Sequence, residues 1–170
     1  MKIQYHAIIG VPAACALIPF LGPYSAVFFA STVLVDSDHY LDYLYRNKFK
    51  DYSIRGLFTY NKLTYDKVNE KNFLGLSLGH TVEFLLLVYA AGAVTDWIWL
   101  KAALWGIVFH MLVDIIHMFQ QKRPYRRCLS VIEYIIRWNR LKSRGMHPEE
   151  LYRSVLEQAA ALSEVKTGKK

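Results

Sequence analysis

A long apolar segment without a charged residue, from Ala7 to Val35, constrains this chain more than any other feature. Such a run is typical of a segment that lies in lipid rather than in water. Pro19, Gly22 and Pro23 interrupt it near the middle, where a helix is expected to kink or end. We therefore predict a hairpin of two helices over residues 7–40, turning near Gly22. Each arm is short for a hydrocarbon core of about 30 Å.

A second pair of apolar segments predicts another hairpin, over residues 73–119. The two segments run over 73–94 and 97–119, and Thr95-Asp96 separates them at the expected turn. Together the two hairpins predict an all-α protein, a membrane-embedded bundle of about four helices. These apolar segments, with polar and basic segments between and after them, suggest a small integral membrane protein with charged loops.

The rest of the chain is polar and basic. An interfacial loop over 41–72, rich in Tyr, Lys and Arg, is expected between the hairpins, and basic amphipathic or soluble helices with a short tail are expected over 122–170. This predicts a membrane-embedded metal-site domain over 1–121 and a separate C-terminal region. The chain has 21 Lys and Arg against 14 Asp and Glu, and the basic residues gather in the loop and after residue 121. Positively charged loops of membrane proteins lie on the cytoplasmic side.

Histidines and carboxylates stand near the ends of the apolar segments. An ionised side chain within lipid costs about 2.5–3.5 kcal/mol on insertion scales unless it is neutralised, and a bound cation neutralises a carboxylate. Counted outward from the two turns, each of the four arms carries a candidate ligand about 15 residues away, so helical arms bring all four to one depth. These residues are His6, Asp36, His80 and His110.

Helical spacing adds further candidates to the same faces. His110, Asp114 and His117 are four and three residues apart, and Glu83 follows His80 by three, so each set shares one face of a helix. A carboxylate one turn from an imidazole is typical of metal sites in helical bundles. Imidazole with carboxylate suits Zn, Mn or Fe, and ligands in excess of four indicate up to two divalent ions. The predicted metal ligands are His6, Asp36, Asp38, His39, His80, His110 and Asp114.

Four of these motifs also occur in a recognisable order: His6 with Gly10, Asp36-Ser37-Asp38-His39, Gly79-His80-Thr81, and the segment 106–114. From His6 to His117 the chain resembles the YdjM-like family of bacterial and archaeal membrane-bound metal-dependent hydrolases. The resemblance implies an integral protein of the cytoplasmic membrane with a hydrolytic metal centre. More remotely, the paired His and carboxylate ligands are similar to those of the zinc phospholipase C and nuclease P1 group, which implies phosphoester hydrolysis.

These residues predict hydrolysis of a phosphoester or lipid substrate at the cytoplasmic leaflet by a metal-activated water. Glu83 is the expected general base or a bridging carboxylate, and His39 and His117 are further catalytic candidates. Anionic lipid headgroups are the expected contacts of a basic rim. That rim would consist of Arg123, Arg126 and Arg127.

Two other classes of protein remain as alternatives. A non-enzymatic membrane adaptor would use the same residues to hold a structural metal and would bind a partner through its basic C-terminal helices. A haem or redox protein would need facing histidines without adjacent carboxylates, whereas each histidine cluster here contains a carboxylate. Nucleic acid is disfavoured as a partner because the basic C-terminal region has no pattern beyond its charge. The sequence does not define an oligomeric state.

Overall fold

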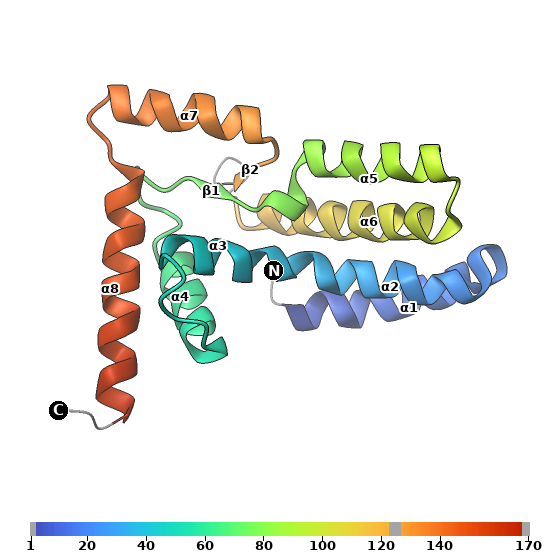
Figure 1. Ribbon diagram of the computed structural model, residues 1–170, viewed down its shortest axis with the longest axis horizontal. Helices are drawn as coiled ribbons and strands as arrows, with labels where there is room; N and C mark the ends of the chain where they lie inside the picture. The colour runs from blue at the N-terminus through green and yellow to red at the C-terminus, as the bar shows by residue number, and fades with distance from the viewer. Residues whose placement is uncertain (1–2, 123–126, 168–170) are drawn as a thin grey trace. The chain divides into compact units, whose positions relative to one another are not determined.

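The computed structural model describes residues 3–122 and 127–167 and is mostly helical (Figure 1). The chain divides into two compact units. Unit 1 comprises residues 1–37 and 78–125, and unit 2 comprises residues 38–77 and 126–170. This differs from the predicted division after residue 121, because the segment 41–72 groups with the C-terminal region and not with the hairpins.

The first hairpin of unit 1 consists of α1 (Ile3–Leu21) and α2 (Ser25–Leu34). Helix α1 continues through Pro19 and ends at Leu21, and the next residue, Gly22, has a φ of +53°, a left-handed conformation that glycine adopts readily. The short 3-10 turn η1 (Gly22–Tyr24) then reverses the chain. The predicted position of this turn is confirmed.

The second hairpin consists of α5 (Val82–Thr95) and α6 (Ile98–Gln120). The predicted turn between them is confirmed, with Asp96 in the left-handed region at φ 54°. The prediction of a helix from Phe73 onward is wrong, because α5 begins nine residues later. Thr81 is extended, and its hydroxyl accepts a hydrogen bond from the backbone N–H of Phe84 at 3.3 Å, which caps the start of the helix.

Helices α2 and α6 of unit 1 pack closely because of a glycine at their contact. A Cβ added at Gly106 would meet the backbone carbonyl of Phe28 and would lie 2.9 Å from Cβ of Ser31. Small residues at such contacts let helix backbones approach one another. Ile107 and Met111, on either side of His110 in α6, are buried together in a small apolar core. The close approach therefore lies one turn from a predicted metal ligand.

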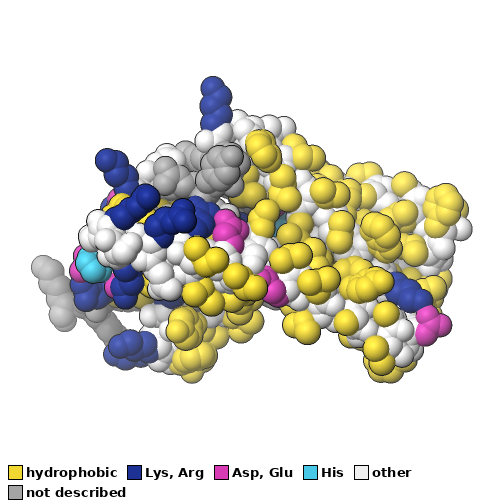
Figure 2. Space-filling view, turned by 90° about the horizontal axis from the view of Figure 1, so that it is seen from above, with side chains coloured by type: hydrophobic (Ala, Val, Ile, Leu, Met, Phe, Trp, Pro, Cys, Tyr) yellow, Lys and Arg dark blue, Asp and Glu magenta, His cyan; other side chains and the backbone are white. Residues whose placement is uncertain are grey.

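Hydrophobic side chains cover much of the face of unit 1 that Figure 2 shows, and many large apolar side chains of its helices are exposed. Two helical stretches are long and apolar enough to cross a membrane: Gln4–Arg46, which the turn at Gly22 interrupts, and Ile98–Gln120. Only 11% and 28% of their most apolar windows are buried. Helix α5 has 14 residues, or about 21 Å, which is shorter than a typical hydrocarbon core. Two candidate membrane helices are thus found where about four were predicted.

Unit 2 contains four helices and a two-residue parallel pairing of strands β1 and β2. The segment 41–72, predicted as an interfacial loop, is largely helical, because α3 and α4 occupy much of it. A serine caps α4: the Ser53 hydroxyl accepts from the Gly56 N–H at 3.0 Å. The last helix starts at Pro148. The elements are α3 (Asp38–Arg46), α4 (Ile54–Asp66), β1 (Gly75–Leu76), β2 (Arg127–Cys128), α7 (Val131–Ser143) and α8 (Pro148–Thr167).

The core of unit 2 combines aromatic packing with a polar network. Tyr60 and Tyr152 are buried together, and the Arg46 guanidinium lies 3.4 Å from the centre of the Tyr152 ring. Asp42 accepts hydrogen bonds from Arg46 at 2.8 Å and from the Tyr60 hydroxyl at 2.9 Å. Because these polar groups satisfy one another, the segment after the first hairpin is an ordered part of a folded unit.

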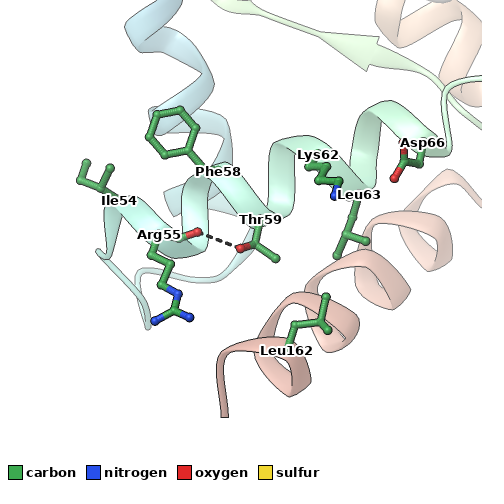
Figure 3. Close-up of a pocket in the computed structure, with 8 residues that line it drawn as sticks. All are labelled: Ile54, Arg55, Phe58, Thr59, Lys62, Leu63, Asp66 and Leu162. Carbon is green, nitrogen blue, oxygen red and sulfur yellow. Dashed lines mark hydrogen bonds between the residues drawn. The ribbon is translucent and has the colours of Figure 1, made fainter. Parts of the chain in front are cut away.

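A groove of about 650 Å³ lies between α4 and α8 of unit 2 (Figure 3). Four of its eight lining residues are apolar and four are polar or charged, and Leu162 of α8 faces the residues of α4. None of the predicted metal ligands lines this groove.

Candidate metal centre

Five of the predicted ligands meet in unit 1, at the end of the hairpins that lies away from their turns (Figure 1). Their side chains are 0–9% exposed. His6 comes from α1, and His110 and Asp114 come from α6. Asp36 and His80 come from two 3-10 turns, η2 (Val35–Ser37) after α2 and η3 (Leu78–His80) before α5. Four segments distant in sequence therefore supply one buried cluster.

The ligand nitrogens of His80 and His110 lie together, and one carboxylate oxygen each of Asp36 and Asp114 lies near both nitrogens. His80 Nε2 lies 2.8 Å from His110 Nε2, and each nitrogen lies 3.4 Å from Asp36 Oδ1. Asp114 Oδ2 lies 3.7 Å from His110 Nε2 and 4.0 Å from His80 Nε2. Ligand atoms about 2.0–2.1 Å from a tetrahedral ion would be roughly 3.3 Å apart. The observed separations scatter around that value, so the cluster has the dimensions of a metal site.

A backbone carbonyl fixes the orientation of His110. Its Nδ1 lies 2.7 Å from the carbonyl oxygen of Thr32 in α2. A carbonyl oxygen can only accept a hydrogen bond, so Nδ1 must carry the proton, and Nε2 of the neutral ring presents its lone pair to the cluster. A hydrogen bond of this kind from the remote nitrogen is typical of metal-binding histidines. Helix α2 thus orients His110 although Thr32 contributes no side-chain ligand.

His6 supplies a further nitrogen to the same cluster. Its ring stacks on that of His110 with a centroid separation of 3.7 Å, and its Nε2 lies 3.1 Å from Asp114 Oδ1. Nε2 is buried, yet within the described part of the chain it has no hydrogen-bond partner of acceptable geometry. His6, Asp36 and His110 form one possible ligand group, and His80, His110 and Asp114 form another. A buried nitrogen that forms no hydrogen bond is available to coordinate a metal ion.

The charges of the cluster also fit a metal ion. Asp36 and Asp114 are two carboxylates with 9% and 6% exposed side chains, and the groups around them are imidazoles. Burying carboxylates without a compensating charge is strongly unfavourable. A divalent cation would balance the two negative charges while the histidines stay neutral. These buried His and Asp groups could therefore hold a metal ion.

Four other predicted site residues lie outside both ligand groups. Asp38 and His39 open α3 of unit 2, where His39 Nδ1 lies 3.9 Å from Asp38 Oδ1 and 3.5 Å from the Ser77 hydroxyl. Glu83 is half-buried in the first turn of α5. His117 Nε2 lies 2.8 Å from Gln121 Nε2 in α6. Of the predicted basic rim, Arg123 and Arg126 lie outside the described residues, and Arg127 is in β2.

Two residues that position the cluster were missed in the sequence, because neither acts through a side chain that binds a metal or takes part in catalysis. Thr32 acts through its backbone carbonyl, which any residue could supply at that position. Gly106 permits the close approach of α2 and α6, and it lies one helical turn before His110. A glycine four residues before a buried histidine is the sequence signal that could have identified this contact.

Comparison with known proteins adds no identification. No family model matches the chain, and no curated protein or solved structure matches it significantly.

Proposed function

We propose that this protein is a membrane-embedded, metal-dependent hydrolase that acts on a phosphoester or lipid substrate at the cytoplasmic leaflet. The observation that carries the proposal is the convergence of three imidazoles and two carboxylates from four segments of unit 1. Such a mixture of nitrogen and oxygen ligands suits zinc, and it also suits manganese or iron. When bound, the metal would lower the pKa of a water molecule and stabilise negative charge on a phosphoryl or acyl oxygen.

The charge balance favours one divalent ion over two. Asp36 and Asp114 together neutralise a single 2+ charge, and the histidines add none when they act as ligands. His80 and His110 would hold the ion with the two carboxylates, and the Thr32 carbonyl would keep His110 in the correct tautomer. A second ion would need a further anion, and substrate phosphate could provide it.

The location of unit 1 in a membrane rests on which residues are exposed. A core helix of a soluble protein buries its apolar face, but the two apolar stretches of this chain are largely unburied. Phe20, Leu87 and Trp105 are 81%, 69% and 62% exposed. Contiguous apolar surface of this kind marks contact with lipid or with another protein. Lipid is the partner that would cover all sides of both hairpins.

Glu83 is the residue we assign to proton transfer. It lies in the first turn of α5, three residues after the ligand His80 and half-buried. A positioned carboxylate can accept a proton from an attacking water and pass it to a leaving group. His117, one turn beyond Asp114 on α6, is the remaining candidate for this role within unit 1.

A second candidate function follows from the burial of the ligands. Structural metal sites are closed, whereas catalytic sites keep an open coordination position. With side chains 0–9% exposed, the cluster also suits a structural ion that fastens α1, α6 and the two 3-10 turns together. The protein would then be a membrane adaptor without turnover. The haem alternative is not favoured, because Asp36 Oδ1 lies 3.4 Å from both His80 and His110.

Turnover and metal content measured on the same preparations distinguish the two candidates. We expect detergent-purified full-length protein to hydrolyse phosphodiester or phospholipid substrates, to lose activity on chelation and to regain it with zinc. Glu83→Gln should lower kcat by about 100-fold or more without changing metal content. Glu157→Gln, the same change on the exposed face of α8, is the matched control. Full metal occupancy with no turnover on any substrate would favour the adaptor.

A further inference from the structure

A second site in unit 2 has the properties of an anion-binding pocket. It is a cavity of about 190 Å³ between one face of α7 and the segment that leads to β1. Four of its six lining residues are cations, and the other two are apolar. The lining residues are Lys71, Phe73, Arg137, Arg140, Leu141 and Arg144.

Three of the four cations of this pocket form no ion pair with any residue that the structure describes, unlike nearby cations. Arg137 pairs with Glu133 at 2.9 Å. Among the described residues, the other three lining cations form no ion pair, whereas nearby Lys67 pairs with Glu70 at 2.7 Å and Lys142 with Glu149 at 3.2 Å. Like charges gathered around one concavity repel one another unless an anion enters it. We therefore expect an anionic ligand to bind in the pocket and balance this positive charge.

The chemistry and the size of the pocket select a phosphate group. Arginine side chains bind phosphate oxygens through paired N–H groups, and lysine adds a point charge. The volume is below the roughly 300–1,000 Å³ of pockets that enclose whole drug-sized ligands. The pocket thus accommodates a phosphate headgroup while the remainder of a larger ligand stays outside.

The adjacent face of α7 indicates what that remainder is. Ile132, Ile135 and Ile136 are spaced by three and one residues, and they are 64%, 52% and 54% exposed. Arg140 follows Ile136 by four residues, so it lies one turn further along the same side of the helix. An exposed apolar stripe bordered by arginines is typical of a helix that lies in a membrane interface. The isoleucines would reach the acyl chains while the arginines remain at headgroup depth.

We propose that α7 and the pocket beside it bind the phosphate of an anionic phospholipid. This inference goes beyond the metal-dependent function and uses none of the metal-site residues, although it rests on the proposed membrane location. Unit 2 follows Ser37 directly in the chain, so membrane lipids would be its most abundant nearby anions. The proposal makes unit 2 a lipid-binding element.

The test measures binding of tail-labelled phosphatidylglycerol to the detergent-purified full chain by fluorescence anisotropy, with tail-labelled phosphatidylcholine for comparison. The pocket variant is Arg140→Gln with Arg144→Gln. Each basic residue near an anionic lipid contributes about fivefold in affinity, so removing two of them should weaken phosphatidylglycerol binding by about 30-fold. The control is Lys142→Gln with Arg55→Gln, which removes two charges outside the pocket and should weaken binding by less than about threefold.

Two further arms identify the ligand. Ile135→Ser with Ile136→Ser should weaken lipid binding, and inorganic phosphate should displace the labelled lipid only at far higher concentration than unlabelled phosphatidylglycerol does. Equal losses in the pocket variant and its control, or equal binding of phosphatidylcholine, would overturn the proposal. Displacement by inorganic phosphate or by a single-stranded oligonucleotide as efficiently as by the lipid would also overturn it. Metal content of each preparation separates this failure from a failure of the metal centre.

Discussion

Replacing Gly106 by alanine should disrupt the metal centre without touching a ligand. The added Cβ would lie 2.9 Å from Cβ of Ser31 and would meet the Phe28 carbonyl oxygen, which belongs to the backbone and cannot rotate away. Carbon atoms pack about 3.5–4.0 Å apart, so α2 and α6 must separate locally by roughly 0.6 Å or more. This displacement acts one helical turn from the cluster.

The separation reaches the contact that orients His110. The distance from His110 Nδ1 to the Thr32 carbonyl oxygen, now 2.7 Å, would lengthen to about 3.3 Å or beyond, where the hydrogen bond is weak. Loss of such an orienting contact typically lowers metal affinity 10–100-fold. Overpacking of a helix contact destabilises a fold by about 1–3 kcal/mol. We therefore expect Gly106→Ala to weaken zinc binding by about 10-fold or more.

Competition with a chromophoric chelator measures this affinity in detergent-purified protein. Gly92→Ala is the matched control, because a Cβ at Gly92 in α5 would lie 3.5 Å from Leu100 Cβ, an ordinary contact. The control should bind zinc as the unmodified chain does. Zinc affinity within about twofold of the original in Gly106→Ala would refute the link between helix approach and the orientation of His110.

Three further predictions concern the labelling of the two cysteines and the acid unfolding of unit 2. Burial raises the pKa of the Cys128 thiol to about 11, with Arg137 opposing the shift, so a water-soluble maleimide should label it about 300-fold more slowly than a free thiol. Cys15, exposed on α1, should stay unlabelled in intact membranes because lipid covers it, and rapid labelling would place it in water. Burial tends to raise the pKa of Asp51, but hydrogen bonds from Tyr43 and Ser53 lower it overall. The resulting stability is present above about pH 4 and lost as pH falls further, so Asp51→Asn should flatten the acid side of the unfolding profile.

The hairpins could be predicted because their signals are local. An uncharged run with Gly22 and Pro23 near its centre limits where the chain can turn, and Thr95-Asp96 does the same for the second pair of helices. The start of α5 could not be placed, because apolar residues before Thr81 fit a helix or an extended strand equally well. The cap at Thr81 decides the boundary through a backbone hydrogen bond. Hydropathy carries no information about that bond.

The helices of unit 2 were missed for a different reason. Their inward positions are occupied by tyrosine and arginine, whose polar ends make α3 and α4 resemble an interfacial loop. Tyr60 is 1% exposed, and Arg46 is held between Asp42 and the ring of Tyr152. Burial of such residues depends on partners distant in sequence, among them α8. The local sequence pattern of 41–72 does not predict contacts with such distant residues.

For the metal cluster, equal distance from the two turns was an effective guide. His6, Asp36, His80 and His110, placed by that count, lie in the two ligand groups, and Asp114 joins them through helical spacing. The count could not separate Asp36 from Asp38, two residues apart. The 3-10 turn η2 ends at Ser37, and Asp38 opens the next helix in the other unit. The end of a helix, which sequence locates poorly, decided between the two carboxylates.

Metal content per chain tests the central claim most directly. Elemental analysis of detergent-purified protein without a histidine tag should give about one equivalent of zinc or a related divalent metal. His110→Gln with Asp114→Asn should reduce it below about 0.1 equivalent, because the variant removes a nitrogen ligand and a negative charge. His147→Gln with Asp96→Asn makes the same chemical changes at exposed positions and should keep the metal. Absence of bound metal in the unmodified protein, or equal metal in both variants, would contradict the account.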